Sequence, residues 1–145
     1  MPFVVSASNW ECHLRLANDR RAPRIARRTV HIALTDYSYV RGVADTAELL
    51  TSELVANAVQ HSDGPVTVRL RARPGVVRVG VMDNHPELPD PLPCTTDQDF
   101  GRGLFLVEAL ADRWGRYPLA CQASAAAGWK VVWFELAGTA QVCVT

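Results

Sequence analysis

Residues Glu53–His61, with the sequence ELVANAVQH, carry the clearest structural signal in this chain. The carboxylate of Glu53 and the carboxamide of Asn57 stand four residues apart in an otherwise apolar run, so they share one face of a helix. Apolar neighbours such as Leu54 and Val55 predict that much of this helix is buried. A charged side chain is seldom buried without a partner, so this pair needs an explanation. At the edge of a core, the pair can hold a hydrated Mg2+ and orient a nucleophile.

The chain on either side of this helix predicts a single α+β domain. Its 145 residues, of which 48% are hydrophobic, suit one domain with a sizeable core. Apolar periodicity predicts strands at about 10–16, 66–72, 76–82, 114–122 and 129–136, and helices at about 23–34, 45–61 and 104–112. Because this order is not regular βαβ alternation, we expect a mixed, mostly antiparallel sheet with helices on one face, in two layers. Asp45 is expected to cap the second helix. We expect a domain over 10–137, with tails at 1–9 and 138–145.

Composition narrows the classes of partner and location. The formal net charge is zero, which gives no overall case for nucleic-acid binding. No apolar run approaches the ~20 residues of a membrane span, and no signal peptide is evident, so a cytoplasmic location is expected. Arginines crowd the first third of the chain, where they form either a solvated helix face or a docking surface for an acidic partner. The cysteines lack the spacing of a zinc site, and Cys12 is expected to face the core.

Four segments, in order, resemble the motifs of the GHKL ATPases, the superfamily of histidine-kinase ATPase domains, Hsp90, gyrase B and MutL. Glu53–His61 resembles the N box, and the other three segments are Val79–Asp83, Gly101–Leu104 and Gly128–Phe134. The pattern over about residues 10–137 is similar to the short actinobacterial branch of anti-sigma-factor serine/threonine kinases of the RsbW and SpoIIAB type. The resemblance implies the GHKL (Bergerat) two-layer α/β sandwich, with ATP and Mg2+ as cofactors.

The N-box resemblance gives roles to two residues of the second helix. Asn57 would bind Mg2+ through its amide oxygen, since this ion prefers oxygen ligands and keeps waters and substrate phosphates beside them. Glu53 would be the catalytic base, orienting or deprotonating the nucleophile that attacks the γ-phosphate. The alternatives are a surface ion pair for Glu53 and a buried amide satisfied by the backbone for Asn57.

The remaining motifs imply the rest of a nucleotide site. Asp83 would read adenine, because a carboxylate accepts the hydrogen bond that the exocyclic amine donates. Gly101 and Gly103 would let the backbone approach the phosphates, and Arg102 would contact the γ-phosphate. Leu104 would be the first apolar residue of a helix that starts after the glycines, whose free N–H groups bind anions. The alternatives are a turn beginning at Asp83 and an ordinary glycine-rich helix entry.

One segment departs from the family pattern. GHKL proteins often show Asp-x-Gly-x-Gly after the adenine strand, but here Asp83 is followed by Asn84, His85, Pro86 and Glu87, without either glycine. The loop must therefore differ locally, because glycine reaches backbone conformations that other residues adopt only with strain. The proline-rich stretch 84–100 would be the lid over the nucleotide. There is no Walker A loop in the sequence.

Several functions remain open at this point. The leading hypothesis is a kinase that phosphorylates an anti-anti-sigma (STAS) protein and binds a sigma factor. The second is a non-catalytic interaction module of the same fold, with weak or no nucleotide binding. The ATPase half of a two-component histidine kinase is a weaker reading, and nucleic-acid binding is the weakest, because no aromatic platform accompanies the arginines. A homodimer is expected as one form of the protein.

Overall fold

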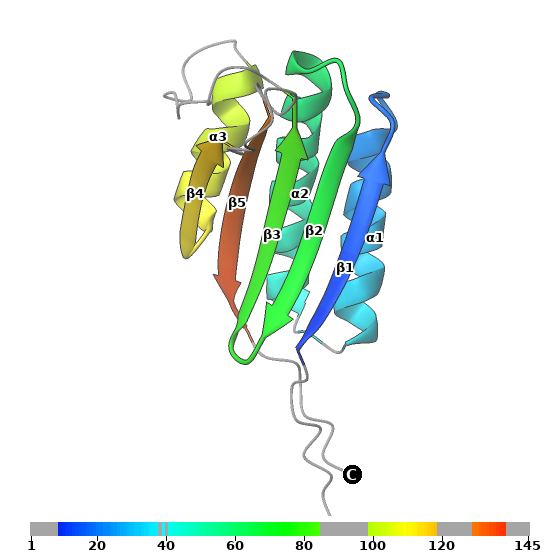
Figure 1. Ribbon diagram of the computed structural model, residues 1–145. Helices are drawn as coiled ribbons and strands as arrows, with labels where there is room; N and C mark the ends of the chain where they lie inside the picture. Colours follow the sequence, from blue (N-terminus) through cyan, green and yellow to red (C-terminus); the bar gives the residue numbers. More distant parts are fainter. Residues whose placement is uncertain (1–8, 38, 40, 85–98, 119–128, 139–145) are drawn as a thin grey trace, which may run out of the picture.

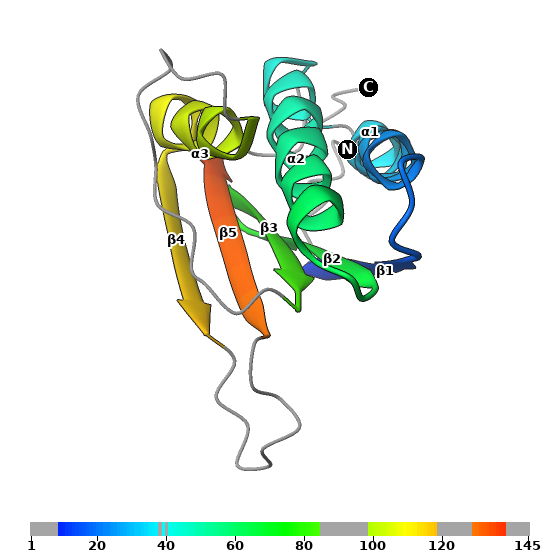
Figure 2. The same cartoon turned by 90° about the horizontal axis from the view of Figure 1, so that it is seen from above.

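The computed structural model describes residues 9–37, 39, 41–84, 99–118 and 129–138. Within them the chain forms a five-stranded sheet in which every neighbouring pair is antiparallel, and Figure 2 shows the three helices on one side of it. In sheet order the strands are β1 (Trp10–Leu16), β2 (Val66–Arg73), β3 (Val76–Asp83), β5 (Lys130–Ala137) and β4 (Arg113–Pro118) (Figure 1). The helices are α1 (Ala22–Asp36), α2 (Arg41–His61) and α3 (Asp99–Leu110). The predicted two-layer α+β fold is confirmed.

Two helix starts differ from the prediction. Helix α2 begins at Arg41, so Asp45 lies inside the helix and the prediction that it caps α2 was wrong. Helix α3 begins at Asp99, so Gly101 and Gly103 belong to its first turns instead of preceding it. Glycine in a helix costs up to about 1 kcal/mol relative to alanine. Burial of apolar side chains further along α3 offsets this cost, which local propensity alone does not reveal.

The strand boundaries follow the alternation of the sequence closely. β2 and β3 each extend one residue beyond the predicted end, and Gly75 at φ 80° supplies the left-handed residue of the turn that joins them. β4 is described as far as Pro118, and the rest of the predicted strand lies outside the described residues.

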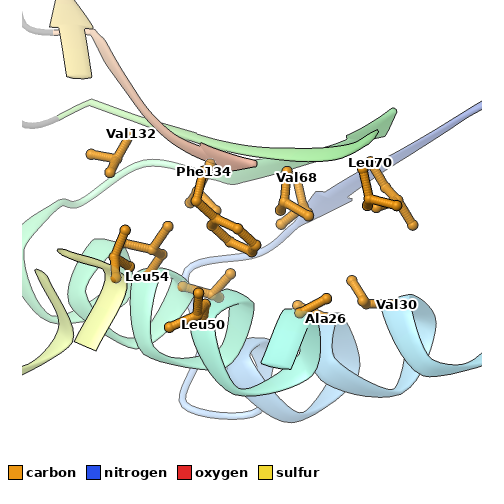
Figure 3. Packing of buried hydrophobic residues seen from close by; sticks show 14 of the residues in the cluster. Ala26, Val30, Leu50, Leu54, Val68, Leu70, Val132 and Phe134 are labelled. Carbon is orange, nitrogen blue, oxygen red and sulfur yellow. The ribbon is translucent and has the colours of Figure 1, made fainter. Parts of the chain in front are cut away.

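The core lies between the inner face of the sheet and the helices (Figure 3). Side chains recurring at helical spacing on α1 and α2 meet the alternate residues of β2 and β5. Those labelled in Figure 3 are Ala26, Val30, Leu50, Leu54, Val68, Leu70, Val132 and Phe134, all 5% exposed or less. Cys12 packs against this core from β1, as expected. The other cysteines, residues 85–98 of the predicted lid and nearly all of the two tails lie outside the described residues, and the last two residues of the predicted lid belong to α3.

The outer face of the sheet is polar and strongly basic. Its register places Glu11, Arg71, Arg78, Glu135 and Arg113 in one row across all five strands. Among the described residues of this face, six arginines stand against two glutamates: Arg15, Arg69, Arg71, Arg73, Arg78 and Arg113 against Glu11 and Glu135. The face also holds a hollow of about 330 Å3 that arginines and Trp133 line.

Glu135 is the buried centre of that row. Its side chain is only 4% exposed, and three arginines surround it, with Arg78 Nε at 3.0 Å, Arg73 at 3.3 Å and Arg113 at 3.7 Å. The Arg78 guanidinium also stacks over the Trp133 ring, 4.0 Å from its centroid. None of the described helices is long and apolar enough to cross a membrane.

Candidate nucleotide site

Helix α2 presents Glu53 and Asn57 on successive turns at the end of the helix nearest α3. Asn57 is buried, with 9% of its surface exposed, and Glu53 is half-buried. The intervening Leu54 belongs to the core, which fixes the rotation of the helix and directs the polar pair toward its margin. The predicted pairing of a carboxylate and an amide on one helix face is therefore present.

Helix α3 reaches this pair through a residue without a side chain. A Cβ atom at Gly103 would lie 2.5 Å from Asn57 Nδ2 and 3.4 Å from the backbone oxygen of Glu53. Leu104, the next residue, is fully buried. Gly103 thus allows α3 to lie directly on the turn of α2 that carries the candidate site.

The other two residues of this motif are placed only in part. The backbone of Gly101 and Arg102 lies in the first turn of α3. The side chain of Arg102 lies outside the described part of the structure, so its predicted contact with a γ-phosphate stays a prediction. The anion-binding N–H groups at the start of this helix belong to residues from Asp99 onward, not to residues after the glycines.

Asp83 ends β3 on the inner face of the sheet and is almost fully buried, with 3% of its surface exposed. In the register of β3 and β5 it stands directly opposite Lys130. The Lys130 Nζ donates a hydrogen bond of 2.7 Å to Asp83 Oδ1, and both side chains are 5% exposed or less. The carboxylate keeps its function as a hydrogen-bond acceptor, but a buried cation already engages it.

A small cavity joins the predicted residues. Asn57, Asp83 and Leu104 line a space of about 10 Å3 together with Lys130, and the other lining residues are Leu54, Val81 and Val132. This volume is about that of one water-sized probe. Glu53 does not line the cavity and stands one helical turn away from Asn57.

The chemical types present are those that a magnesium nucleotide needs, but the cavity with Lys130 in place has no room for a base. The site offers a carboxylate acceptor, an amide oxygen and a helix start, and Gly103, which has no Cβ, lies directly against Asn57. Asn57 would hold Mg2+ and Asp83 would receive the base. These elements come from α2, β3 and α3, so tertiary packing alone brings them together.

Sequence reasoning missed Lys130 as a site residue. It is the single lysine of the chain, and it alternates with Val132 and Phe134 on the buried face of β5. A charged residue in phase with core residues was the available signal, since such residues are rarely buried without a partner. Its partner could not be identified because the pairing of β3 with β5 skips β4 in chain order.

Comparison with known proteins agrees with this geometry. Residues 16–119 match the family model described as a histidine kinase-like ATPase domain. An uncharacterized protein of Streptomyces coelicolor, SCO4941, is 41% identical over 69 residues, which cover 44% of this chain and 66% of that protein. The crystal structure of the RsbU and RsbW domains of Rv1364c from Mycobacterium tuberculosis is similar in fold, with a TM-score of 0.61 at 20% identity.

That comparison covers 94% of this chain and only 35% of the mycobacterial one, so this chain spans about a third of that protein. The identity is low enough that the likeness shows the fold alone. This fold is the one that the predicted resemblance implies, and the family match confirms the GHKL assignment and implies an ATP-binding domain. This chain belongs to the family of histidine kinase-like ATPase domains.

Proposed function

We propose that this chain is an ATP- and Mg2+-dependent regulatory kinase. It would transfer the γ-phosphate of ATP to a serine or threonine of an anti-anti-sigma (STAS) protein, and would bind a sigma factor. The observation that carries the proposal is the convergence of Asn57, Asp83 and Leu104 on one cavity in a domain of this family. The similar fold of the mycobacterial structure, which comprises RsbU and RsbW domains, supports the same branch.

Each residue has a distinct task in this proposal. Asp83 receives the adenine amine, and an oxo purine is rejected because it presents an acceptor there. Asn57 holds Mg2+, which neutralises phosphate charge when bound. Glu53, one turn away, orients the partner's hydroxyl and removes its proton. Arg102 and the N–H groups at the start of α3 bind the phosphates.

Helix α1 supplies a surface suited to a protein partner. Its exposed side combines arginines, among them Arg24 and Arg28, with Ile25 at 46% and Ile32 at 58% exposure. Exposed apolar side chains surrounded by cations fit an acidic partner with apolar anchors. A homodimer and a cytoplasmic location stay predictions.

A second function has its own support. The cavity of about 10 Å3 and the Lys130–Asp83 pair leave little room for a base among the described residues. The sequence also lacks both glycines expected after Asp83. These features favour a non-catalytic interaction module with weak or no nucleotide binding.

Titration calorimetry with ATP separates the two functions. We expect native protein to bind ATP in the presence of Mg2+, and Asn57→Ala to lose the Mg2+-dependent part of the binding. Gln60→Ala is the matched control, because Gln60 lies exposed on the same helix. No binding at millimolar ATP, with both variants folded, would leave the interaction module as the function.

Phosphotransfer to a STAS-domain protein tests the catalytic step. With radiolabelled ATP, Glu53→Gln should lower the rate about 100-fold or more, the usual contribution of a general base. Glu108→Gln is the control, since Glu108 is an exposed glutamate on α3. A Glu53→Gln variant that transfers phosphate at the native rate would remove Glu53 from the mechanism.

A further inference from the structure

Lys130 is a buried cation to which the proposed reaction gives no task. Its backbone position opposite Asp83 and its inward direction bring its ammonium to 2.7 Å from Asp83 Oδ1. Only 4% of its side chain is exposed. A lysine is seldom buried this fully, so the arrangement needs an account beyond the reading of adenine.

The Lys130 side chain also fills space that a base would need. It lines the cavity between Asp83 and Asn57, where apolar side chains of α2, α3 and the sheet surround it. A carboxylate accepts several hydrogen bonds, so the number of acceptors alone does not exclude a second donor. Volume does exclude it, because a space of about 10 Å3 holds at most one water molecule.

The ammonium and the adenine amine also have the same chemistry toward Asp83. Both are hydrogen-bond donors and seek the same carboxylate. With Lys130 in place, an adenine approaching Asp83 would collide with the lysine stem. It would also find the carboxylate already hydrogen-bonded to the lysine ammonium. Breaking a buried ion pair is costly, so the closed arrangement opposes nucleotide entry.

We propose that Lys130 is a built-in competitor of the nucleotide, whose side chain must leave Asp83 before adenine can bind. The proposal rests on the proposed function, because it assigns the base to Asp83. Lys130 thereby sets the apparent affinity of the site. Binding is weakened by the fraction of molecules in which the pair is open.

Chemical acylation of the native protein tests this directly. The amine of Lys130 is the only lysine amine in the chain, so mass spectrometry of its peptide after treatment with an acetyl N-hydroxysuccinimide ester reports one site. Without nucleotide we expect strong protection, and with saturating Mg2+–ATP we expect acylation to rise several-fold. Unchanged protection in protein that calorimetry shows to be saturated would overturn the proposal.

Two substitutions give an independent measurement. Lys130→Ala removes both the cation and the aliphatic stem, so ATP should bind at least about tenfold more tightly. This gain is expected if the Lys130–Asp83 pair is broken in about one native molecule in ten or fewer. Lys130→Arg is the matched control, because it keeps a cation and a long stem, and its affinity should not exceed the native one. Equal or weaker binding by folded Lys130→Ala would contradict the proposal.

The outcomes separate the two proposals. Native protein that binds ATP while Lys130 stays protected leaves the proposed function in place and removes the competitor. An absence of ATP binding in both the native chain and Lys130→Ala removes both proposals. If Lys130→Ala binds ATP and the native chain does not, Lys130 prevents nucleotide binding in the native protein. If Lys130→Ala does not fold, acylation of the native protein decides.

Discussion

Gly103 of α3 lies against Asn57 of α2 so closely that a Cβ on Gly103 would stand 2.5 Å from Asn57 Nδ2. Real Cβ contacts are longer, so either the asparagine or the helix has to move if a side chain is added. Gly103, which is predicted to let the backbone approach the phosphates, therefore has a second reason to be glycine. It sets the distance between the two helices that carry the candidate site.

Gly103→Ala tests this packing. We expect a loss of about 1–3 kcal/mol in the free energy of unfolding, as for other overpacked positions. Because Asn57 is displaced, Mg2+-dependent ATP binding should weaken as well. Denaturant unfolding and calorimetry measure the two effects.

Gly42→Ala is the matched control for that variant. It lies in α2, and an added Cβ would meet nothing within 4 Å. Alanine is the better helix former, so this variant should be unchanged or up to about 1 kcal/mol more stable. A Gly103→Ala protein as stable as Gly42→Ala would show that the helices separate without cost.

Glu135 and Glu11 lie in the same row of the outer face and differ in burial. Glu135→Gln should cost about 2 kcal/mol, the range of hydrogen bonds to charged groups, since three arginines lose their shared anion. Glu11→Gln should change stability far less, because the Glu11 side chain is 37% exposed and its ion pairs with Arg69 and Arg71 are solvated. Urea unfolding of both variants checks the contrast, and equal losses would contradict it.

The pKa of Glu11 is held below its ordinary value of 4.5, first by the hydrogen bond from His13 and then by Arg69. Because the folded pKa is depressed, the stabilisation from Glu11 is present above pH 4.5 and is lost as pH falls through the lowered value. His13→Ala should move this pKa upward. NMR titration of the Glu11 carboxyl carbon measures this pKa. His31→Ala is the control, because it removes a histidine that pairs with a different carboxylate, that of Glu48. A Glu11 pKa that does not change in His13→Ala would contradict the assignment.

Thr51 is a fully buried residue of α2 whose Oγ1 has no hydrogen-bond partner among the described residues. An unsatisfied buried hydroxyl is destabilising, so Thr51→Val, which keeps the shape and removes the hydroxyl, should stabilise the protein by about 1 kcal/mol. Thermal unfolding measures the change. Thr51→Ser retains the hydroxyl and removes a methyl group, so it should destabilise instead. If Thr51→Val proved the less stable of the two, the hydroxyl would have a partner.

Sequence alone was a good guide to the first three strands and to the polar face of α2, although it placed the start of α2 four residues too late. Alternation between core and surface is local, so β1, β2 and β3 could be delimited to within a residue. The face shared by Glu53 and Asn57 follows from helical spacing, which needs no knowledge of the rest of the fold.

The start of α3 and the role of Lys130 could not be obtained in this way. Glycines suggest a helix boundary, but Gly101 and Gly103 both lie within α3, and Gly103 packs against α2. The pair between Lys130 and Asp83 depends on a register between strands 47 residues apart in sequence. Such non-local contacts leave no periodic signal, although a lysine in phase with core residues marks the position.

The outer face of the sheet is basic although the chain as a whole has no net charge. Among the residues that the structure describes, six arginines against two glutamates leave an excess of four positive charges on one side of the sheet, whereas the formal net charge of the chain is zero. The remaining surface must then carry the balancing negative charge. A protein with an isoelectric point near 6.9 should therefore be retained by a cation-exchange resin at neutral pH, oriented with this basic face against the matrix.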